Sequence, residues 1–202
     1  MLVRILNKFF NFFSFKWLHL KWKNIYFNSL AIIGKDSFFY IESRVFNFTQ
    51  KKNNIQIGSF THIRGELLLF AHGGCIKIGD YCYIGEGTRI WSAKEIFIGH
   101  RVLIAHNVNI HDNISHPIDS SLRHEHQKHI ITKGHPTNNL DLKERKIIIK
   151  DDAWIGFNAS ILKGTTIGKG AIIGACSVIT KDVPDFAIVI GNPGKIIGYS
   201  NR

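Results

Sequence analysis

The chain has 202 residues, of which 45% are hydrophobic and 20% are charged, with 18 glycines and 4 prolines. This composition excludes a collagen-like or disordered chain, and the length favours one domain with a substantial core. Twenty-six lysines and arginines against 15 acidic residues give a net charge of +11. An anionic partner is therefore expected, but no nucleic-acid-binding motif accompanies the charge, so we expect no nucleic-acid partner.

The first 30 residues form a basic segment rich in aromatic residues. Its longest uncharged run in the first 20 positions, residues 9–15, is far shorter than the ~20 apolar residues of a membrane-spanning helix. No signal-peptide cleavage site follows it. Two alternatives stay open: the segment packs against the protein or a neighbouring subunit, or it lies on an anionic membrane face as a peripheral contact.

The three cysteines, Cys75, Cys82 and Cys176, show no metal-ligand spacing, and their number is odd. This favours a reducing compartment and burial of the cysteines as small apolar residues. We therefore expect a cytoplasmic protein, with the inner face of the cytoplasmic membrane as its surface if the N-terminal segment binds lipid.

A six-residue repeat runs through most of the chain. From residue 149 the sequence reads IKDDAW IGFNAS ILKGTT IGKGAI IGACSV ITKDVP, with isoleucine first, glycine often second, and a small or β-branched residue fifth. The template also fits from Ile78 and Ile98 and, more loosely, from Ile33 and Ile57. This period matches neither a helix nor an isolated strand, and it indicates a coil with three flat faces.

In such a coil the isoleucines stack inward as one apolar column, and the glycines take corners where φ is often positive. Each coil is stable only through hydrogen bonds to its neighbours. The sequence thus predicts an all-β parallel solenoid over residues 31–197, after the N-terminal segment 1–30 and before a tail at 198–202.

The repeat breaks once in its second half. Ile110 and Ile149 are 39 positions apart, which is not a multiple of six, so residues 112–146 should leave the coil as one extruded loop. Structureless loops of this length are usually functional or disordered. Five histidines lie in it: His116, His124, His126, His129 and His135.

These features resemble the hexapeptide-repeat acetyltransferases, and the block DDAWIGFNASILKGTTIGKGAIIGACSVITKDVPDFAIVIGNPGKII resembles their galactoside, maltose and polysaccharide O-acetyltransferase branch. The resemblance runs from about Ile33 to Ile197. It implies a left-handed parallel β-helix, a homotrimer with sites between subunits, acetyl-CoA as acyl donor and a carbohydrate acceptor. The helical N-terminal module of the maltose and galactoside enzymes is missing, which favours a surface-polysaccharide or lipid-linked acceptor.

The resemblance places the general base at His116, in the stretch SHPID near the start of the loop. Imidazole suits removal of a hydroxyl proton at neutral pH. His111, where the break begins, is the alternative base and otherwise lines the substrate pocket with Trp154 and Trp91. The candidates for orienting the imidazole are Asp112, Asp119, Glu125 and a backbone carbonyl.

In the resembling family, acetyl-CoA lies along a groove between adjacent β-helices and is held by backbone groups of successive coils. Small residues there let the pantetheine arm approach, and lysines meet the phosphates as point charges. Cys176 and Phe157 replace smaller residues of the family pattern and narrow this groove. The matching positions are Gly156, Phe157, Ala175, Thr180, Lys181 and Lys195.

The expected function is acetyl-CoA-dependent O-acetylation of a carbohydrate in capsule, lipopolysaccharide or exopolysaccharide biosynthesis, without a metal. N-acetylation of a nucleotide-linked amino sugar is the alternative within the same chemistry. The spacing of His106, His111 and His116 also suggests a zinc-dependent lyase like the gamma-class carbonic anhydrases, which share the β-helix. A non-catalytic solenoid is the third alternative.

Overall fold

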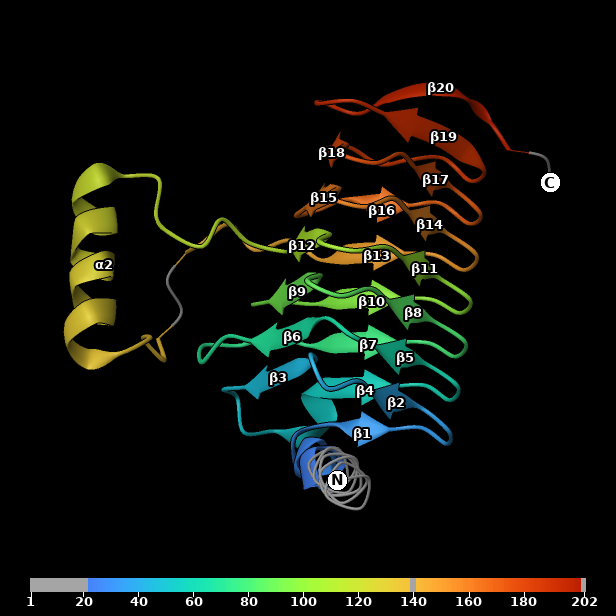
Figure 1. The fold of residues 1–202 in the computed structure, drawn as a ribbon. Coiled ribbons are helices and arrows are strands. Elements are labelled where there is room, and N and C mark those ends of the chain that lie inside the picture. Colours follow the sequence, from blue (N-terminus) through green and yellow to red (C-terminus); the bar gives the residue numbers. More distant parts are fainter. Residues whose placement is uncertain (1–21, 139–140, 201–202) are drawn as a thin grey trace, which may run out of the picture.

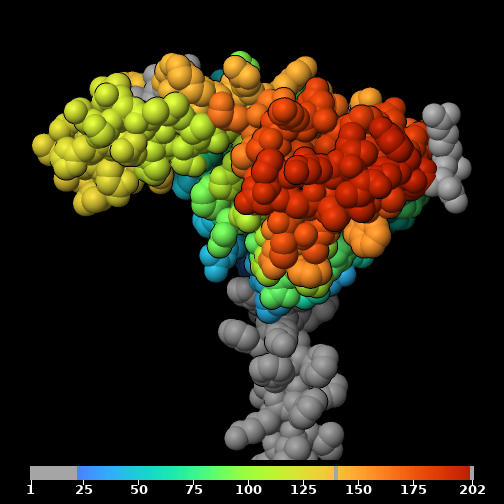
Figure 2. All heavy atoms as spheres, turned by 90° about the horizontal axis from the view of Figure 1, so that it is seen from above, coloured from blue at the N-terminus to red at the C-terminus, as the bar shows by residue number. Residues whose placement is uncertain are grey.

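A computed structural model describes residues 22–138 and 141–200 of the chain. The body is a solenoid of stacked coils, and a loop carrying one helix extends from its side (Figure 1). Seen along the solenoid axis, the body has a roughly triangular section and the loop projects from one corner (Figure 2). The predicted parallel solenoid with an extruded loop is confirmed.

Three sheets form the three faces, and each takes every third strand along most of the chain. The first sheet contains β1 (Ile32–Ile33), β4 (Ile55–Ile57), β7 (Ile76–Ile78), β10 (Ile96–Ile98), β13 (Ile147–Ile149) and β16 (Thr166–Ile167). The second sheet contains β2 (Phe38–Phe39), β5 (His62–Ile63), β8 (Tyr83–Ile84), β11 (Leu103–Ile104), β14 (Trp154–Ile155), β17 (Ile172–Ile173), β19 (Ala187–Ile190) and β20 (Lys195–Tyr199). The third sheet contains β3 (Arg44–Asn47), β6 (Glu66–Leu69), β9 (Arg89–Ser92), β12 (Asn109–His111), β15 (Ser160–Leu162) and β18 (Val178–Ile179). Between β3 and β4 lies a short 3-10 helix, Lys52–Asn54, and only the β19–β20 pair is antiparallel among these strands.

The core is the inward column of isoleucines that the repeat predicts. In the first sheet, Ile98 pairs with Ile78 on one side and with Ile149 on the other, and all three side chains are buried. Each such side chain contributes about 1.5–3 kcal/mol relative to an exposed one. Small residues in the fifth place, such as Ala153 and Ala159, are also fully enclosed.

The glycines in the second place serve a different purpose from the expected one. Gly156 and Gly168 do not have positive φ; instead, an added Cβ would lie 2.6 Å from the backbone nitrogen of Ala175 and 2.4 Å from that of Asp185. The left-handed conformation falls on the fourth place, for example at Cys176 with φ 59°. Glycine is therefore required by the close approach of the next coil, and the prediction of its corner conformation was wrong.

The helix of the extruded loop was also not predicted. α2 (Ser120–Lys133) begins after Asp119, whose side chain accepts a hydrogen bond from Leu122 N–H at 2.9 Å, and it ends at Gly134 with φ 87°. Of its residues only His126 is buried. A helix exposed on nearly every side has no apolar stripe, so periodicity could not reveal it.

The N-terminal segment is described from residue 22 onward. Residues 22–30 are helical, and the buried ring of Phe27 lies 4.9 Å from that of Phe39. Lys23 donates hydrogen bonds to the carbonyls of Tyr40 and Ile41. This part packs against the first coil, in line with the packing alternative. The rest of the segment, residues 1–21, lies outside the described residues, and the membrane alternative stays a prediction.

The three cysteines, which were expected to be buried, differ in their burial. Cys82 is buried and Cys75 half-buried, but Cys176 is exposed, because its left-handed corner turns the side chain away from the core.

Within residues 22–138 and 141–200, no helix combines the length and the apolar content needed to cross a bilayer.

Candidate active site

The root of the loop is held by a buried carboxylate. Asp112 directly follows β12 and is fully buried. It accepts hydrogen bonds from Ser92 Oγ at 2.7 Å and from the backbone N–H groups of Ala93 and Lys94 at 2.8 and 2.9 Å. Its carbonyl oxygen accepts a further bond from Arg145 N–H, at 2.9 Å, where the chain returns to the coil. Asp112 therefore clamps both ends of the loop.

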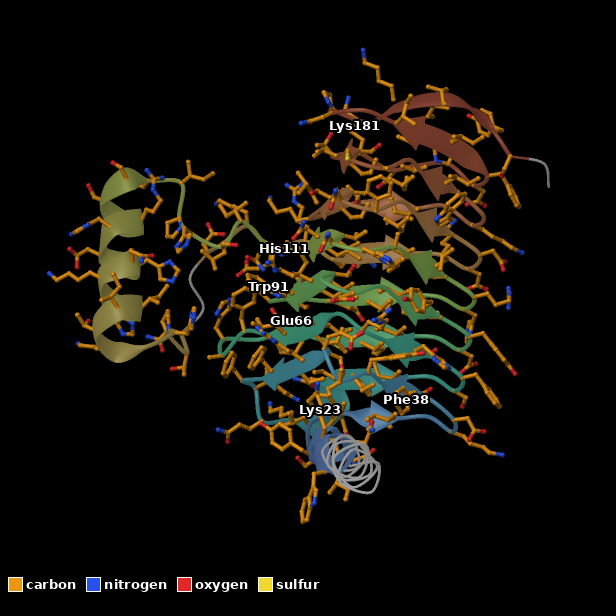
Figure 3. All side chains as sticks on the ribbon, in the orientation of Figure 1. Lys23, Phe38, Glu66, Trp91, His111 and Lys181 are labelled. Carbon is orange, nitrogen blue, oxygen red and sulfur yellow. The ribbon has the colours of Figure 1, made fainter. Side chains whose placement is uncertain are left out.

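Trp91 and His111 form a stack on the outer face of the third sheet. They are register partners in β9 and β12, with ring centroids 4.8 Å apart and planes 17° from parallel. Trp91 Nε1–H donates to Glu66 Oε1 at 2.7 Å, which fixes the indole. The side chains of Glu66, Trp91 and His111 follow one another along the side of the solenoid that faces the loop (Figure 3).

The environment of His111 opposes a positive charge. Burial lowers the pKa of its imidazole, and its buried Nε2 has no hydrogen-bond partner among the described residues. A half-buried imidazole stacked on an indole is compatible with a pocket wall, which was the main expectation for this residue. Its place within the stack does not favour the alternative role as base.

His116 lies where the loop leaves the solenoid, and its imidazole meets that of His126 on α2. The two Nδ1 atoms are 3.3 Å apart and the ring centroids 5.1 Å apart. Burial, followed by the neighbouring imidazoles of His116 and His135, lowers the pKa of His126. A neutral imidazole therefore stands next to the expected base.

A cavity of about 120 Å³ lies between the third sheet and the loop. Its lining includes the imidazoles of His116 and His126 and the indole of Trp91. The other lining residues are Phe70, His72, Ser115, Ile130, His135, Pro136 and Leu142. The cavity is small, partly aromatic and bordered by the expected base, which suits one polar group of a substrate.

Sequence reasoning missed His72, which lies in this lining. Its side chain is 6% exposed, its Nε2 has no hydrogen-bond partner in the described part of the chain, and Glu144 Oε1 is 3.8 Å away. Burial lowers the pKa of this imidazole. A signal existed: Ile57 and Ile78 are 21 positions apart rather than 18, so the repeat slips by three residues near His72.

The expected acetyl-CoA positions lie elsewhere on the surface. The exposed Phe157 and Ala175 occupy corners between the second and third sheets. Trp154, which was expected in the substrate pocket, is 49% exposed and projects from β14 in the second sheet. Thr180 and Lys181 follow β18, and Lys195 begins β20. One chain thus brings His111, His116 and Trp91 together. Trp154 and Lys195 belong to the second sheet, and Phe157 and Ala175 lie at its corners with the third, whereas Thr180 and Lys181 lie two coils beyond His111 at the end of the third sheet.

The donor positions fit acetyl-CoA in most respects. Ala175 is small and exposed, so a ligand can approach its backbone. Lys181 and Lys195 are exposed and form no ion pair within residues 22–138 and 141–200, which leaves both ammonium groups for phosphates. Gly156 differs: it is buried, and the next coil requires its lack of a side chain. Its part in holding acetyl-CoA through the backbone stays a prediction.

The histidines of the break do not converge on a metal site. His106 lies at a corner after β11, His111 ends β12 and His116 belongs to the loop. In the described parts of the chain, no group of three or more histidine, cysteine, aspartate or glutamate side chains is arranged to hold a metal ion.

Comparison with known proteins agrees with this architecture. The family described as "Bacterial transferase hexapeptide (six repeats)" matches residues 146–181. A putative lipopolysaccharide biosynthesis O-acetyl transferase of Escherichia coli K12 is 30% identical over 169 residues, 81% of this chain and 83% of that protein. A probable acetyltransferase of Mycobacterium tuberculosis is 30% identical over 149 residues, 74% of this chain and 45% of that protein. The structure of a point mutant of AntD, an N-acyltransferase from Bacillus cereus, matches with a TM-score of 0.67 and 21% identity over 90% of this chain and 89% of that chain.

The chain belongs to the hexapeptide-repeat acetyltransferase family, in the branch that contains galactoside and polysaccharide O-acetyltransferases. The solenoid is accordingly a left-handed parallel β-helix, as the resemblance implied. The chain spans only 45% to 62% of the length of several curated relatives that it matches.

Proposed function

We propose that the protein is an acetyl-CoA-dependent O-acetyltransferase that modifies a carbohydrate hydroxyl group in surface-polysaccharide biosynthesis. The observation that carries this proposal is the position of His116 beside a cavity walled by Trp91, at the root of the loop. The Escherichia coli relative, named for lipopolysaccharide biosynthesis, supports the acceptor class.

In the proposed reaction, acetyl-CoA supplies an activated acetyl group as a thioester. His116 takes the proton of the acceptor hydroxyl as its oxygen forms the new ester bond. The bond from the acetyl carbon to sulfur breaks, and the proton passes from the imidazole to the departing thiolate. Trp91 forms the wall that limits where the acceptor can lie, and His111 is stacked against its indole.

Direct titration of acetyl-CoA tests the donor half of this proposal. We expect saturable binding, and we expect Lys181→Glu and Lys195→Glu each to weaken it by about 3- to 30-fold, more at low salt than at high salt, because each change replaces an attraction to phosphate by a repulsion. The matched control is Lys52→Glu, an exposed lysine near the opposite end of the solenoid. Absence of binding by the wild-type protein would contradict the proposed function.

We further propose that the complete site forms between copies of this chain in a homotrimer. One chain holds its base at the root of the loop and most of its donor positions on the second sheet or at its corner with the third, so we infer that a neighbour brings the second set. The second sheet supports such contact, because its outward column, joined in register from coil to coil, is largely apolar. Its members are Phe38, His62, Tyr83, Leu103, Trp154, Ile172 and Ile188.

Mixing two inactive variants tests the shared site. His116→Ala removes the base, and Ala175→Trp fills the expected donor groove. Each site would take its base from one copy and its donor groove from a neighbouring copy. In randomly mixed trimers both halves are intact at about a quarter of the sites, so about a quarter of wild-type activity should return. Activity measured after co-refolding an equimolar mixture checks this; mixtures that stay inactive, or a monomer in light scattering, would contradict the shared site.

N-acetylation of an amino sugar stays the second candidate. The AntD structure, of an N-acyltransferase in complex with dTDP and coenzyme A, shares this fold, so the fold alone does not distinguish the two reactions. An amine acceptor needs less help from a base than a hydroxyl does. The size of the effect of His116→Ala on acetyl transfer therefore separates them.

A further inference from the structure

Three carboxylates could orient the base according to the sequence, and the structure gives none of them that role. Asp112 is occupied by the hydrogen bonds that clamp the loop. Asp119 caps α2 by accepting the Leu122 N–H. Glu125 is exposed on α2 and makes no hydrogen bond to either imidazole in the described structure.

The side chain that does meet His116 is His126. The distance of 3.3 Å between the two Nδ1 atoms is too short for two N–H groups or two lone pairs to face each other, so one nitrogen carries the shared proton. His126 is 8% exposed and is the one buried residue of α2, whose other side chains are exposed or half-buried. Its burial is a cost that an ordinary surface helix would avoid.

We propose that His126 is the positioning residue of the general base. The Nδ1–H of His116 donates to Nδ1 of His126, which leaves Nε2 of His116 unprotonated and able to take the proton of the acceptor. This assignment rests on the proposed function of His116. A fixed tautomer and a fixed ring plane are what a general base gains from such a partner.

Two features of the loop favour this assignment. The lowered pKa of His126 keeps its imidazole neutral, so it is able to accept a hydrogen bond and does not compete as a second cation. α2 is closed at both ends, by the Asp119 cap and by Gly134, whose N–H donates to the Ile130 carbonyl at 3.0 Å. A capped helix holds its side chains more precisely than an irregular loop would. The helix thus holds His126 in a fixed position against His116.

Nitrogen-15 NMR of the histidine rings in the full-length wild-type protein tests the tautomer directly, without any acceptor. We expect His116 to carry its proton on Nδ1, whereas His124, exposed on the same helix, should mix both tautomers. A His116 ring protonated on Nε2, or mixed in the same way as His124, would overturn the proposal.

Kinetics supply the second test, with the rate of thiol release from acetyl-CoA measured in the presence of a methyl galactoside as probe acceptor. We expect His126→Phe to lower kcat by about 10- to 100-fold with little change in the KM for acetyl-CoA. His126→Gln, whose amide oxygen can still accept the hydrogen bond, should recover most of the loss, and His124→Gln should match the wild type.

The positioning role of His126 and the proposed function of His116 predict different outcomes for the two variants. If His126→Phe keeps the wild-type kcat while His116→Ala is inactive, the positioning role is wrong and the proposed function stands. If His116→Ala is also fully active, the proposed function itself is wrong. A His126→Gln variant as inactive as His126→Phe, in a protein whose wild-type His116 ring lacks the Nδ1 proton, would assign His126 a purely structural role.

Discussion

Replacing His116 with alanine is expected to lower the rate of acetyl transfer to a hydroxyl acceptor by about 10²- to 10⁴-fold, the usual contribution of a positioned general base. The affinity for acetyl-CoA should not change, because none of Ala175, Lys181 and Lys195 belongs to the loop that carries His116. Steady-state kinetics with titration calorimetry on the same preparation measure both quantities. The loss should appear in kcat, since the imidazole acts on the proton during the chemical step.

A matched change on the same loop controls for disturbance of its fold. His124 is exposed and lies on α2, so His124→Ala should retain wild-type rates. Added imidazole should restore part of the activity of His116→Ala, because the small molecule can enter the space that the side chain left. A His116→Ala variant within a few-fold of wild type would rule out its role as base for an oxygen acceptor and would favour an amine acceptor.

The solenoid could be predicted from the sequence because one position carries most of the information. Isoleucine at 149, 155, 161, 167 and 173 recurs without a slip, and each of these side chains is fully enclosed. A side chain that must fill the same inward slot in every coil leaves a strict period in the sequence. Handedness leaves no such trace in one chain, and it came from the family resemblance.

Features that depend on contact between coils were harder to predict. Positive φ falls on the fourth place of the unit, where Asn158 and Cys176 both tolerate it, so residue type alone does not mark it. Gly156 carries no special φ, and only the approach of the next coil explains it. α2 escaped prediction because a helix outside the core has no periodic apolar face.

The site shows the same division between local and long-range information. His116 was found because its sequence context is local and resembles that of a family. His126 and His72 reach the same cavity from α2 and from an irregularity between β6 and β7, and no short motif connects those segments. Asp112 was considered as a catalytic partner, and only the neighbouring coil shows that its carboxylate is already fully engaged.

Through these hydrogen bonds, Asp112 anchors the start of the loop to the solenoid. Its two carboxylate oxygens accept bonds from one hydroxyl group, one side-chain amide and two backbone N–H groups, and all of these lie close to the core. An amide in its place would turn an NH₂ group toward some of these donors. Buried donors that lose an acceptor each cost about 1–3 kcal/mol.

Asp112→Asn is therefore expected to lower the free energy of unfolding by at least about 3 kcal/mol, with a lower urea midpoint. The exposed Asp182 offers the control: its carboxylate accepts one bond, from Thr166 N–H at 2.7 Å, so Asp182→Asn should cost less than about 1 kcal/mol. Because the Asp112 carboxylate fixes the place where the chain leaves the solenoid toward His116, acetyl transfer should fall at temperatures where Asp112→Asn is still folded. Equal urea midpoints for wild type and Asp112→Asn would show that the loop is anchored by other contacts, and the geometry that joins His116 to the solenoid would then need a different explanation.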